Sequence, residues 1–353
     1  MLDAYTVQDK RSLETGAGIS PVGPSRKVKA AIRKAVKRIG EAQDPESSRL
    51  RRSLSSRFGV PMDAFVFGNS IRELLCLILD VLRPKRVLVI GPAPGIYEGV
   101  SVAAGAEVSC ICGPEGKGFA VEIEAVRNEV RGADLLFIAN PDRVAGRLVE
   151  NADMETLLRF ASERKVTVVL DESLIEFTGK DGHLGSASTC GHLIVLRTTA
   201  FFHGLPGLEL AYAVASPPVR SALHKKRCVG INILAQEAAR TALKDKTYAR
   251  LTRKYVCDEK ALLAKAIGKI KGVTFLGSDS NMFLIKAEGF ERKMAEALRR
   301  AGFRIEDCAD VCGLGPHFFR LSVMEHDRNK KFVRILREVA DGTRGKEPCT
   351  EST

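Results

Sequence analysis

The sequence predicts an α/β protein with a large domain built on a mostly parallel sheet and a smaller α+β domain. Its 353 residues exceed the roughly 100–200 residues of a typical single domain. After residue 60, short β-branched runs alternate with longer amphipathic stretches, as in sheets whose strands are joined by crossover helices. The short runs are mostly apolar, which is typical of strands that are covered on both faces.

The candidate strands of the large domain are six apolar runs: Arg86–Ile90, Glu107–Ile111, Leu135–Ile138, Val166–Leu170, Leu193–Arg197 and Leu210–Ala215. Stretches with helical periodicity lie between several of them: Ser70–Leu82, Val121–Val130 and Asp153–Arg164. Each of these stretches is long enough to cross from one parallel strand to the next. This order favours a parallel sheet with helices on both faces.

A second region follows a long helical stretch that we expect to run from Ala235 through Leu263. Its candidate elements, in order, are strands Val273–Phe275 and Met282–Ile285, helix Glu291–Ala301, strands Phe303–Ile305 and Phe318–Val323, and helix Arg328–Ala340. We therefore expect four parts: 1–40, an N-terminal arm that joins the small domain; 41–245, the large α/β domain; 246–340, the small α+β domain; and 341–353, a polar, disordered tail.

Charge and hydropathy narrow the class of protein. There are 55 Lys and Arg against 43 Asp and Glu, a formal net charge of +12, but the basic residues are scattered along amphipathic stretches, as on solvated helix faces. No helix-turn-helix or zinc-finger signature accompanies them, so we expect no nucleic-acid partner. Because no apolar stretch reaches the ~18 residues of a membrane span and the N-terminus lacks a signal-peptide core, we expect no membrane and a cytoplasmic location.

Nine cysteines occur at irregular spacing, which fits free thiols in a reducing compartment better than a disulfide framework. The close pairs are Cys110 with Cys112, and Cys308 with Cys312. Neither pair has the spacing of a zinc site, so we expect no metal.

Seven segments carry motifs in a recognisable order: ISPVGPSRKV (19–28), QDPESSRLRRSLSSRFGV (43–60), FGNSIRELL (67–75), ANPDRVAGRLV (139–149), VVLDESLIEF (168–177), VLRTTAFFHGLPGLELAYAVAS (195–216) and GPHFFRLSV (315–323). Together they resemble the fold-type-I, pyridoxal-phosphate-dependent aminotransferases of class I/II, above all histidinol-phosphate aminotransferases and threonine-phosphate decarboxylases. The resemblance spans about residues 18–340. It implies a seven-stranded, mostly parallel sheet and an active site at a homodimer interface; a heterodimer with an active paralogue is equally compatible.

Catalysis in that family needs a lysine that binds the cofactor as an aldimine and then moves a proton. In this sequence the resemblance places Phe201 at the lysine position, with Arg197 and Thr198 before it and Gly204 and Gly207 after it. No lysine lies between residues 180 and 225 to replace it. The side chain at the lysine position therefore has no nitrogen.

The resemblance also implies a changed phosphate site. The family holds the cofactor phosphate at a helix N-terminus with a hydroxyl and an arginine. Thr198 keeps the hydroxyl, but Glu209 stands at the arginine position, where an anion repels phosphate. Ser70, Ile71 and Arg72 replace the usual small polar residues of the helix-start loop, and Arg72 brings back a positive charge from another direction.

Positions that contact the cofactor ring in the family are altered as well. Asp171 stands where a carboxylate pairs with the pyridine nitrogen. The other ring positions, with the family residue they replace, are Arg143 for asparagine, Leu174 for tyrosine, Pro94 for the stacking aromatic, and Ala42 for the tyrosine that reaches the neighbouring subunit's phosphate. Tyr97 remains aromatic one turn away from the stacking position. Together, these altered positions predict a degenerate cofactor pocket.

Two residues keep family roles in the small domain. Arg320 matches the arginine that clamps the substrate carboxylate, and Asn281 precedes its strand as in relatives. For Arg320, ligand binding and the position of a surface arginine, facing a helix or at a strand end, both remain open.

Physical chemistry adds three expectations. A buried aspartate needs a cationic partner, so we hypothesise an ion pair between Asp171 and Arg143. His203, beside the lost lysine, is either a proton shuttle or, more commonly for a histidine, a satisfied side chain. Phe201 and Phe202 are expected to fill the volume that the aldimine and the pyridine ring would occupy.

Three functions remain open. The chain is a non-catalytic aminotransferase homologue that binds a small carboxylate or a partner; a transaminase or decarboxylase of phosphorylated, amino-acid-like substrates that holds its cofactor noncovalently; or a cofactor-free enzyme with repurposed chemistry. Losing the lysine together with most cofactor contacts favours the first. A role in an amino-acid or cobalamin pathway is an analogy with the relatives alone.

Overall fold

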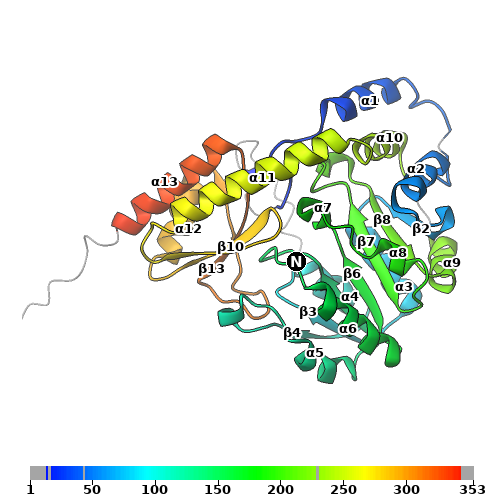
Figure 1. Cartoon of the computed structure of the whole chain (residues 1–353), viewed down its shortest axis with the longest axis horizontal. Coiled ribbons are helices and arrows are strands. Elements are labelled where there is room, and N and C mark those ends of the chain that lie inside the picture. The colour runs from blue at the N-terminus through cyan, green and yellow to red at the C-terminus, as the bar shows by residue number, and fades with distance from the viewer. Residues whose placement is uncertain (1–12, 15–16, 43, 228–229, 343–353) are drawn as a thin grey trace, which may run out of the picture.

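The large domain contains a seven-stranded sheet in the order β2-β8-β7-β6-β5-β3-β4. The structure is a computed structural model that describes residues 13–14, 17–42, 44–227 and 230–342 (Figure 1). The strands are β2 (Phe65–Gly68), β3 (Arg86–Ile90), β4 (Glu107–Ile111), β5 (Leu135–Ala139), β6 (Thr167–Asp171), β7 (Leu193–Thr198) and β8 (Ala211–Ala215). Strands β4, β3, β5, β6 and β7 are parallel, and β8 runs antiparallel to both of its neighbours. The mostly parallel seven-stranded sheet is confirmed.

All six predicted strands form, but the seventh, β2, was missed. It has only four residues, a run too short to indicate a strand by its pattern.

Helices cover both faces of this sheet, because successive strand residues point to opposite sides. In β5, Leu136 and Ile138 face one core while Leu135 and Phe137 face the other. The first face carries α2 (Ser48–Phe58), α5 (Ile123–Val130), α6 (Asn151–Glu163), α8 (Leu184–Ala187) and α10 (Ile233–Ala242). The second face carries α3 (Ile71–Leu82), α4 (Ile96–Ala103) and α9 (Pro217–Lys226). Single turns of 3-10 helix form at Met62–Ala64, Glu115–Lys117 and Pro206–Leu208.

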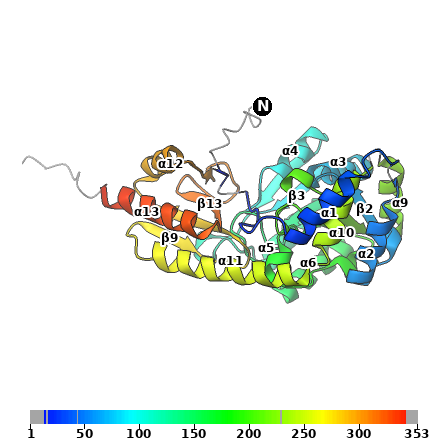
Figure 2. The same ribbon diagram turned by 90° about the horizontal axis from the view of Figure 1, so that it is seen from above.

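The small domain is built on a four-stranded antiparallel sheet in the order β12-β13-β10-β9. Its strands are β9 (Val273–Leu276), β10 (Met282–Ala287), β12 (Glu306–Asp307) and β13 (Phe318–Ser322). Its helices are α11 (Lys246–Ile267), α12 (Glu291–Arg300) and α13 (His326–Gly342). Strand β1 (Leu13–Glu14) pairs with β11 (Phe303–Arg304). Figures 1 and 2 show α11 running from the large domain into the small domain, where it lies beside α13.

The N-terminal segment reaches both domains. Helix α1 (Arg26–Val36) packs on α10 of the large domain, while β1 lies with the small domain. The short α7 (Ile175–Thr178), which follows β6, contacts α11.

Three expected boundaries change. The helical stretch from Ala235 to Leu263 is two helices, because the Asp245 carboxylate accepts the Tyr248 amide at 3.3 Å and caps a new helix. The predicted strand Phe303–Ile305 ends at Arg304 as β11, and β12 follows at Glu306–Asp307 in a different sheet. Helix α13 continues to Gly342, so the predicted disordered tail at 341–353 is wrong for its first two residues, and 343–353 lie outside the described residues.

The expectation of free thiols is wrong for Cys110 and Cys312, which form a disulfide bond. The bond joins β4 at the edge of the large sheet to the segment before β13 of the small domain, 202 residues away in sequence. Local spacing could not show this proximity, because it results from docking the two domains. Cys112 and the buried Cys308 lie nearby in one apolar cluster as free thiols.

Within the described ranges, no helix has the length and apolar character to cross a membrane. In the same part of the chain, no group of three or more His, Cys, Asp or Glu side chains is arranged to hold a metal ion.

Candidate functional site

Asp171 is the last residue of β6, and its side chain is 1% exposed. Oδ2 accepts the Tyr97 hydroxyl at 2.6 Å and lies 3.4 Å from Arg143 Nη1. Oδ1 accepts the Ser173 amide at 2.8 Å and the Ser173 hydroxyl. The hypothesised Asp171–Arg143 ion pair is confirmed. We call these four residues, Asp171, Arg143, Tyr97 and Ser173, the Asp171 cluster.

The sequence did not predict the contacts of Tyr97 or Ser173 with Asp171. Tyr97 comes from the first turn of α4, is fully buried, and its ring stacks on Phe137 with the centroids 5.2 Å apart. Burial and the adjacent Asp171 carboxylate raise the pKa of Tyr97 well above its usual value, so the phenol stays protonated and donates a hydrogen bond to Asp171. The Asp171 carboxylate, which by resemblance would accept a hydrogen bond from the pyridinium N–H, therefore accepts one from the Tyr97 hydroxyl.

The N-terminus of α3 forms the second part of the site. Ser70 is the N-cap and accepts the Glu73 amide at 3.1 Å. The amide of Ile71, the first residue of α3, donates to Glu209 Oε1 at 3.2 Å. The Thr198 hydroxyl donates to the same oxygen at 3.0 Å. Burial raises the pKa of Glu209, while these two donors oppose the rise. A carboxylate of the chain thus occupies the anion position at the helix N-terminus.

Arg72 does not supply a cation inside this pocket, because its residue is exposed on α3. Positive charge near Glu209 comes instead from Arg143, whose charge lowers the pKa of the Glu209 carboxyl.

Phe201, at the lysine position, is half-buried. The Arg143 guanidinium carbon lies 4.8 Å from the centre of its ring, in a cation–π contact. The Phe201 carbonyl accepts the Ser20 amide at 2.8 Å, which ties the lysine loop to the N-terminal arm. Phe202 lies in the small-domain core beside Phe177, and Phe201 packs against the same core. Phe201 therefore borders the Asp171 cluster, whereas Phe202 packs between the domains.

The remaining ring positions lie outside the cluster or have structural roles. Leu174 is 1% exposed and belongs to the small-domain core. Pro94 is partly exposed, and its carbonyl accepts the Tyr97 amide at 3.4 Å. Ala42 is exposed in a hollow beside Arg38 and Glu237, so the chain does not bring it to the other site residues.

Arg320 is central in β13 and is not a surface arginine at a strand end. Glu306 lies directly opposite it in the strand register, and the two side chains form an ion pair. Arg320 Nη1 also donates to the Arg143 carbonyl at 3.2 Å. A carboxylate from the same chain thus holds the guanidinium that the resemblance assigns to a substrate carboxylate. Asn281 is buried and donates to the Gly18 carbonyl at 2.7 Å.

His203 is 1% exposed, and its Nε2 lies 2.6 Å from Glu176 Oε2. Its ring stacks on Tyr248 of α11, with the centroids 6.1 Å apart. Gly204 follows with φ 64°, and a Cβ there would lie 2.8 Å from the Gly23 backbone, so only glycine fits. The contacts of His203 with Glu176 and Tyr248 therefore join the domains, although neither ring nitrogen makes a hydrogen bond to a described group.

Glu176 gives this contact a pH dependence. Burial alone would raise its pKa, but the charges of His203 and Arg57 lower it to about 2. Because the folded-state pKa lies below the unfolded value, the stabilisation is complete above about pH 4.5 and is lost as pH falls towards about 2.

We expect acidification over that range to remove up to about 3 kcal/mol of stability through Glu176. Urea unfolding of wild type and Glu176→Gln at several pH values measures the difference. The variant should show a shallower decline, while Glu98→Gln, at an exposed position, should follow wild type. Equal slopes for wild type and Glu176→Gln would contradict the assignment.

The residues present do not fit pyridoxal phosphate. Phe201 offers no amine for the aldehyde, and the α3 N-terminus already binds the Glu209 carboxylate. The Asp171 carboxylate that would pair with the ring nitrogen accepts hydrogen bonds from Tyr97 and Ser173. Each of the three anchoring points of the cofactor is changed or engaged by the chain itself.

The fold and the match to a family model define the class of protein: the chain belongs to the class I and II aminotransferases, whose model matches residues 14–336. It is 29% identical over 334 residues to histidinol-phosphate aminotransferase 2 of Archaeoglobus fulgidus, covering 94% of each chain. It is 24% identical over 333 residues to threonine-phosphate decarboxylase of Salmonella typhimurium, covering 94% of this chain and 92% of that protein.

A solved structure agrees on the fold. Histidinol-phosphate aminotransferase of Sinorhizobium meliloti, in complex with pyridoxal-5'-phosphate, superposes with a TM-score of 0.84 at 21% identity, covering 94% of this chain and 91% of that one. The resemblance to fold-type-I, pyridoxal-phosphate-dependent enzymes is thereby confirmed.

Sequence reasoning missed four functional contacts: the Glu209 carboxylate on the α3 N-terminus, the Tyr97 hydroxyl on Asp171, the Glu306 carboxylate on Arg320, and the Glu176 carboxylate on His203. The partners of Arg320 and His203 could have been sought from a chemical rule. A buried charged side chain in the sequence requires a partner, and applying that rule to Arg320 and His203 as it was applied to Asp171 would have prompted a search for carboxylates.

Proposed function

We propose that this chain is a non-catalytic class I/II aminotransferase homologue whose own side chains replace the cofactor, and that it acts as a regulatory or partner subunit. One observation carries the proposal: the Glu209 carboxylate binds the Ile71 amide and the Thr198 hydroxyl, where the family binds the cofactor phosphate. An internal anion that is covalently part of the chain competes with phosphate at every concentration of free cofactor.

Two further contacts support the same conclusion. Tyr97 and Arg143 satisfy Asp171, so a ring nitrogen would have to displace a buried hydrogen bond and an ion pair. Glu306 satisfies Arg320, so the proposal does not extend to a substrate carboxylate at that guanidinium. These contacts also disfavour a noncovalent cofactor, and none of them favours cofactor-free chemistry.

The partner that we propose is a second copy of the chain or an active paralogue. Large apolar side chains are exposed in the N-terminal segment: Val22 at 47%, Val36 at 46% and Ile39 at 65%. Such residues grouped on one segment fit a surface that another subunit covers.

The experiment compares cofactor binding in wild type and a rebuilt variant. Purified wild type mixed with pyridoxal phosphate should form no yellow adduct that borohydride fixes to the chain. Phe201→Lys alone should bind weakly, because Glu209 still repels the phosphate. Phe201→Lys/Glu209→Arg should form the adduct at position 201, since it has both the amine and the cation.

The matched control is Phe201→Met/Glu209→Arg, which restores the cation without the amine and should form no fixed adduct. Absorbance spectra and peptide mass mapping after borohydride treatment distinguish the variants. A stoichiometric adduct of wild type, mapped to any of its lysines, would refute the non-catalytic assignment. Co-purification of wild type with an active paralogue would support the partner role.

A further inference from the structure

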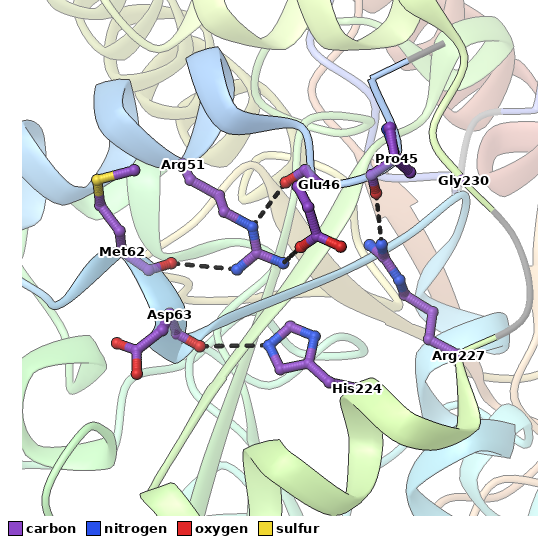
Figure 3. Close-up of a pocket in the computed structure, with 8 residues that line it drawn as sticks. All are labelled: Pro45, Glu46, Arg51, Met62, Asp63, His224, Arg227 and Gly230. Carbon is purple, nitrogen blue, oxygen red and sulfur yellow. Dashed lines mark hydrogen bonds and ion pairs between the residues drawn. The ribbon is translucent and has the colours of Figure 1, made fainter.

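A hollow lies apart from the Asp171 cluster, where the start of α2, the segment before β2 and the end of α9 meet (Figure 3). Its volume is about 540 Å³, within the range of small-molecule sites. The charged and titratable side chains that line it are Glu46, Arg51, Asp63, His224 and Arg227. None of them takes part in the cofactor-equivalent pocket, so what this hollow binds is independent of the proposed function.

Arg51 is fixed by neutral groups. Only 6% of the residue is exposed, yet its donors bind backbone carbonyls: Nε binds that of Glu46 at 2.7 Å, and Nη1 binds those of Met62, at 3.1 Å, and Phe65. Nη2 is buried and hydrogen-bonds no described group. The nearest opposite charge is the Glu46 carboxylate at 3.8 Å, and that side chain is 70% exposed.

Arg227 repeats this pattern from the other side. Its Nη2 donates to the Pro45 carbonyl at 2.7 Å, while Nη1 is buried and hydrogen-bonds no group in the described part of the chain. Figure 3 shows the Glu46 carboxylate lying between the Arg51 and Arg227 guanidinium groups. Two guanidinium groups anchored by carbonyls therefore flank one exposed carboxylate, which pairs with Arg51 at 3.8 Å.

His224 faces the same hollow. Its Nε2 lies 3.2 Å from the Asp63 carbonyl, whereas the Asp63 carboxylate points away and pairs with Arg220. Burial lowers the pKa of His224, and the charges of Arg51 and Arg227 lower it further, while that of Glu46 opposes them. An added anion would change this balance and raise the pKa of the imidazole.

We propose that this hollow is a binding site for a small organic anion, whose carboxylate or phosphate oxygens accept from Arg51 Nη2 and Arg227 Nη1 in place of Glu46. Planar guanidinium edges suit such oxyanions, and buried donors without a partner gain most from one. The volume leaves room for an organic body beside the anionic group, along Met62.

The test titrates the full chain with inorganic phosphate and, separately, with succinate, and follows the His224 ring resonances by NMR. At least one probe should raise the pKa of His224 with a saturable dependence on concentration, and the stronger probe identifies the preferred oxyanion. Arg227→Gln should weaken that binding at least tenfold. Glu46→Gln should tighten it, because the competing carboxylate is gone.

Arg164→Gln, at an exposed position at the end of α6, is the matched control and should bind as wild type does. Arg227 is chosen over Arg51 because Arg51 binds three backbone carbonyls and its loss threatens folding. The proposal is wrong if neither probe shifts His224, or if Arg227→Gln and Arg164→Gln bind equally. A phosphate site in the cofactor-equivalent pocket would respond to Glu209→Arg instead, which separates this result from the proposed function.

Discussion

Replacing Arg197 with methionine is expected to lower the free energy of unfolding by about 3–5 kcal/mol, because it leaves a buried carboxylate without its cation. The Arg197 and Glu172 side chains are 4% and 0% exposed. Arg197 Nε and Nη2 donate to the same Glu172 oxygen at 2.9 and 2.7 Å. Burial would raise the pKa of Glu172, but Arg197 and His183 together lower it, so the carboxylate stays charged.

Urea unfolding at neutral pH measures this loss. The double variant Arg197→Met/Glu172→Gln should recover much of it, since it removes both buried charges, and the double-mutant cycle gives the coupling energy. The matched control is Arg127→Met, because Arg127 pairs with Glu124 at 3.5 Å with both side chains about half exposed or more. That exposed pair should contribute less than about 1 kcal/mol. A loss below about 1 kcal/mol for Arg197→Met would show that the pair is not a major source of stability.

Removing the Cys110–Cys312 disulfide is expected to lower the free energy of unfolding by about 2–4 kcal/mol. The bond closes a loop between residues 202 positions apart, so it greatly restricts the unfolded chain. Burial raises the pKa of the neighbouring thiols, to about 11 for Cys112 and about 12 for Cys308. At neutral pH these thiols carry little thiolate, and we expect them not to exchange with the disulfide.

Urea unfolding of Cys312→Ser under oxidising conditions tests this effect. Cys257→Ser, which removes an exposed free thiol of α11, should leave stability unchanged. Dithiothreitol should destabilise wild type but not Cys312→Ser. If the reductant acts equally on both proteins, the bond does not stabilise the fold.

Much of the architecture follows from local patterns. The runs at 135–138, 166–170 and 193–197 became strands, because a strand buried on both faces needs mostly apolar side chains. The pattern failed where the signal was short or interrupted: β2 has four residues, and the break before α11 depends on one capping aspartate.

The candidate site was predictable in part, for a chemical reason. Alignment of the lysine loop was enough to place Phe201 at the lysine position. A buried Asp171 also required a cationic partner, which correctly indicated Arg143. The Tyr97 contact was not predictable, because the family's ring-stacking position falls on Pro94. The side chain that reaches Asp171 comes from Tyr97, about one turn later. The Glu209 contact also depends on the relative placement of β7, β8 and α3, which no local pattern encodes.

The sequence by itself determined the strand order along the chain, the family and the absence of an amine at position 201, since each depends on residue types in fixed local order. Only the tertiary structure decided that Glu209, Tyr97 and Glu306 satisfy the groups that bind cofactor and substrate in relatives. It likewise decided that Cys110 meets Cys312. The physical reason is that hydrogen bonds and disulfides depend on distances of a few ångströms between segments far apart in sequence, and packing alone sets those distances.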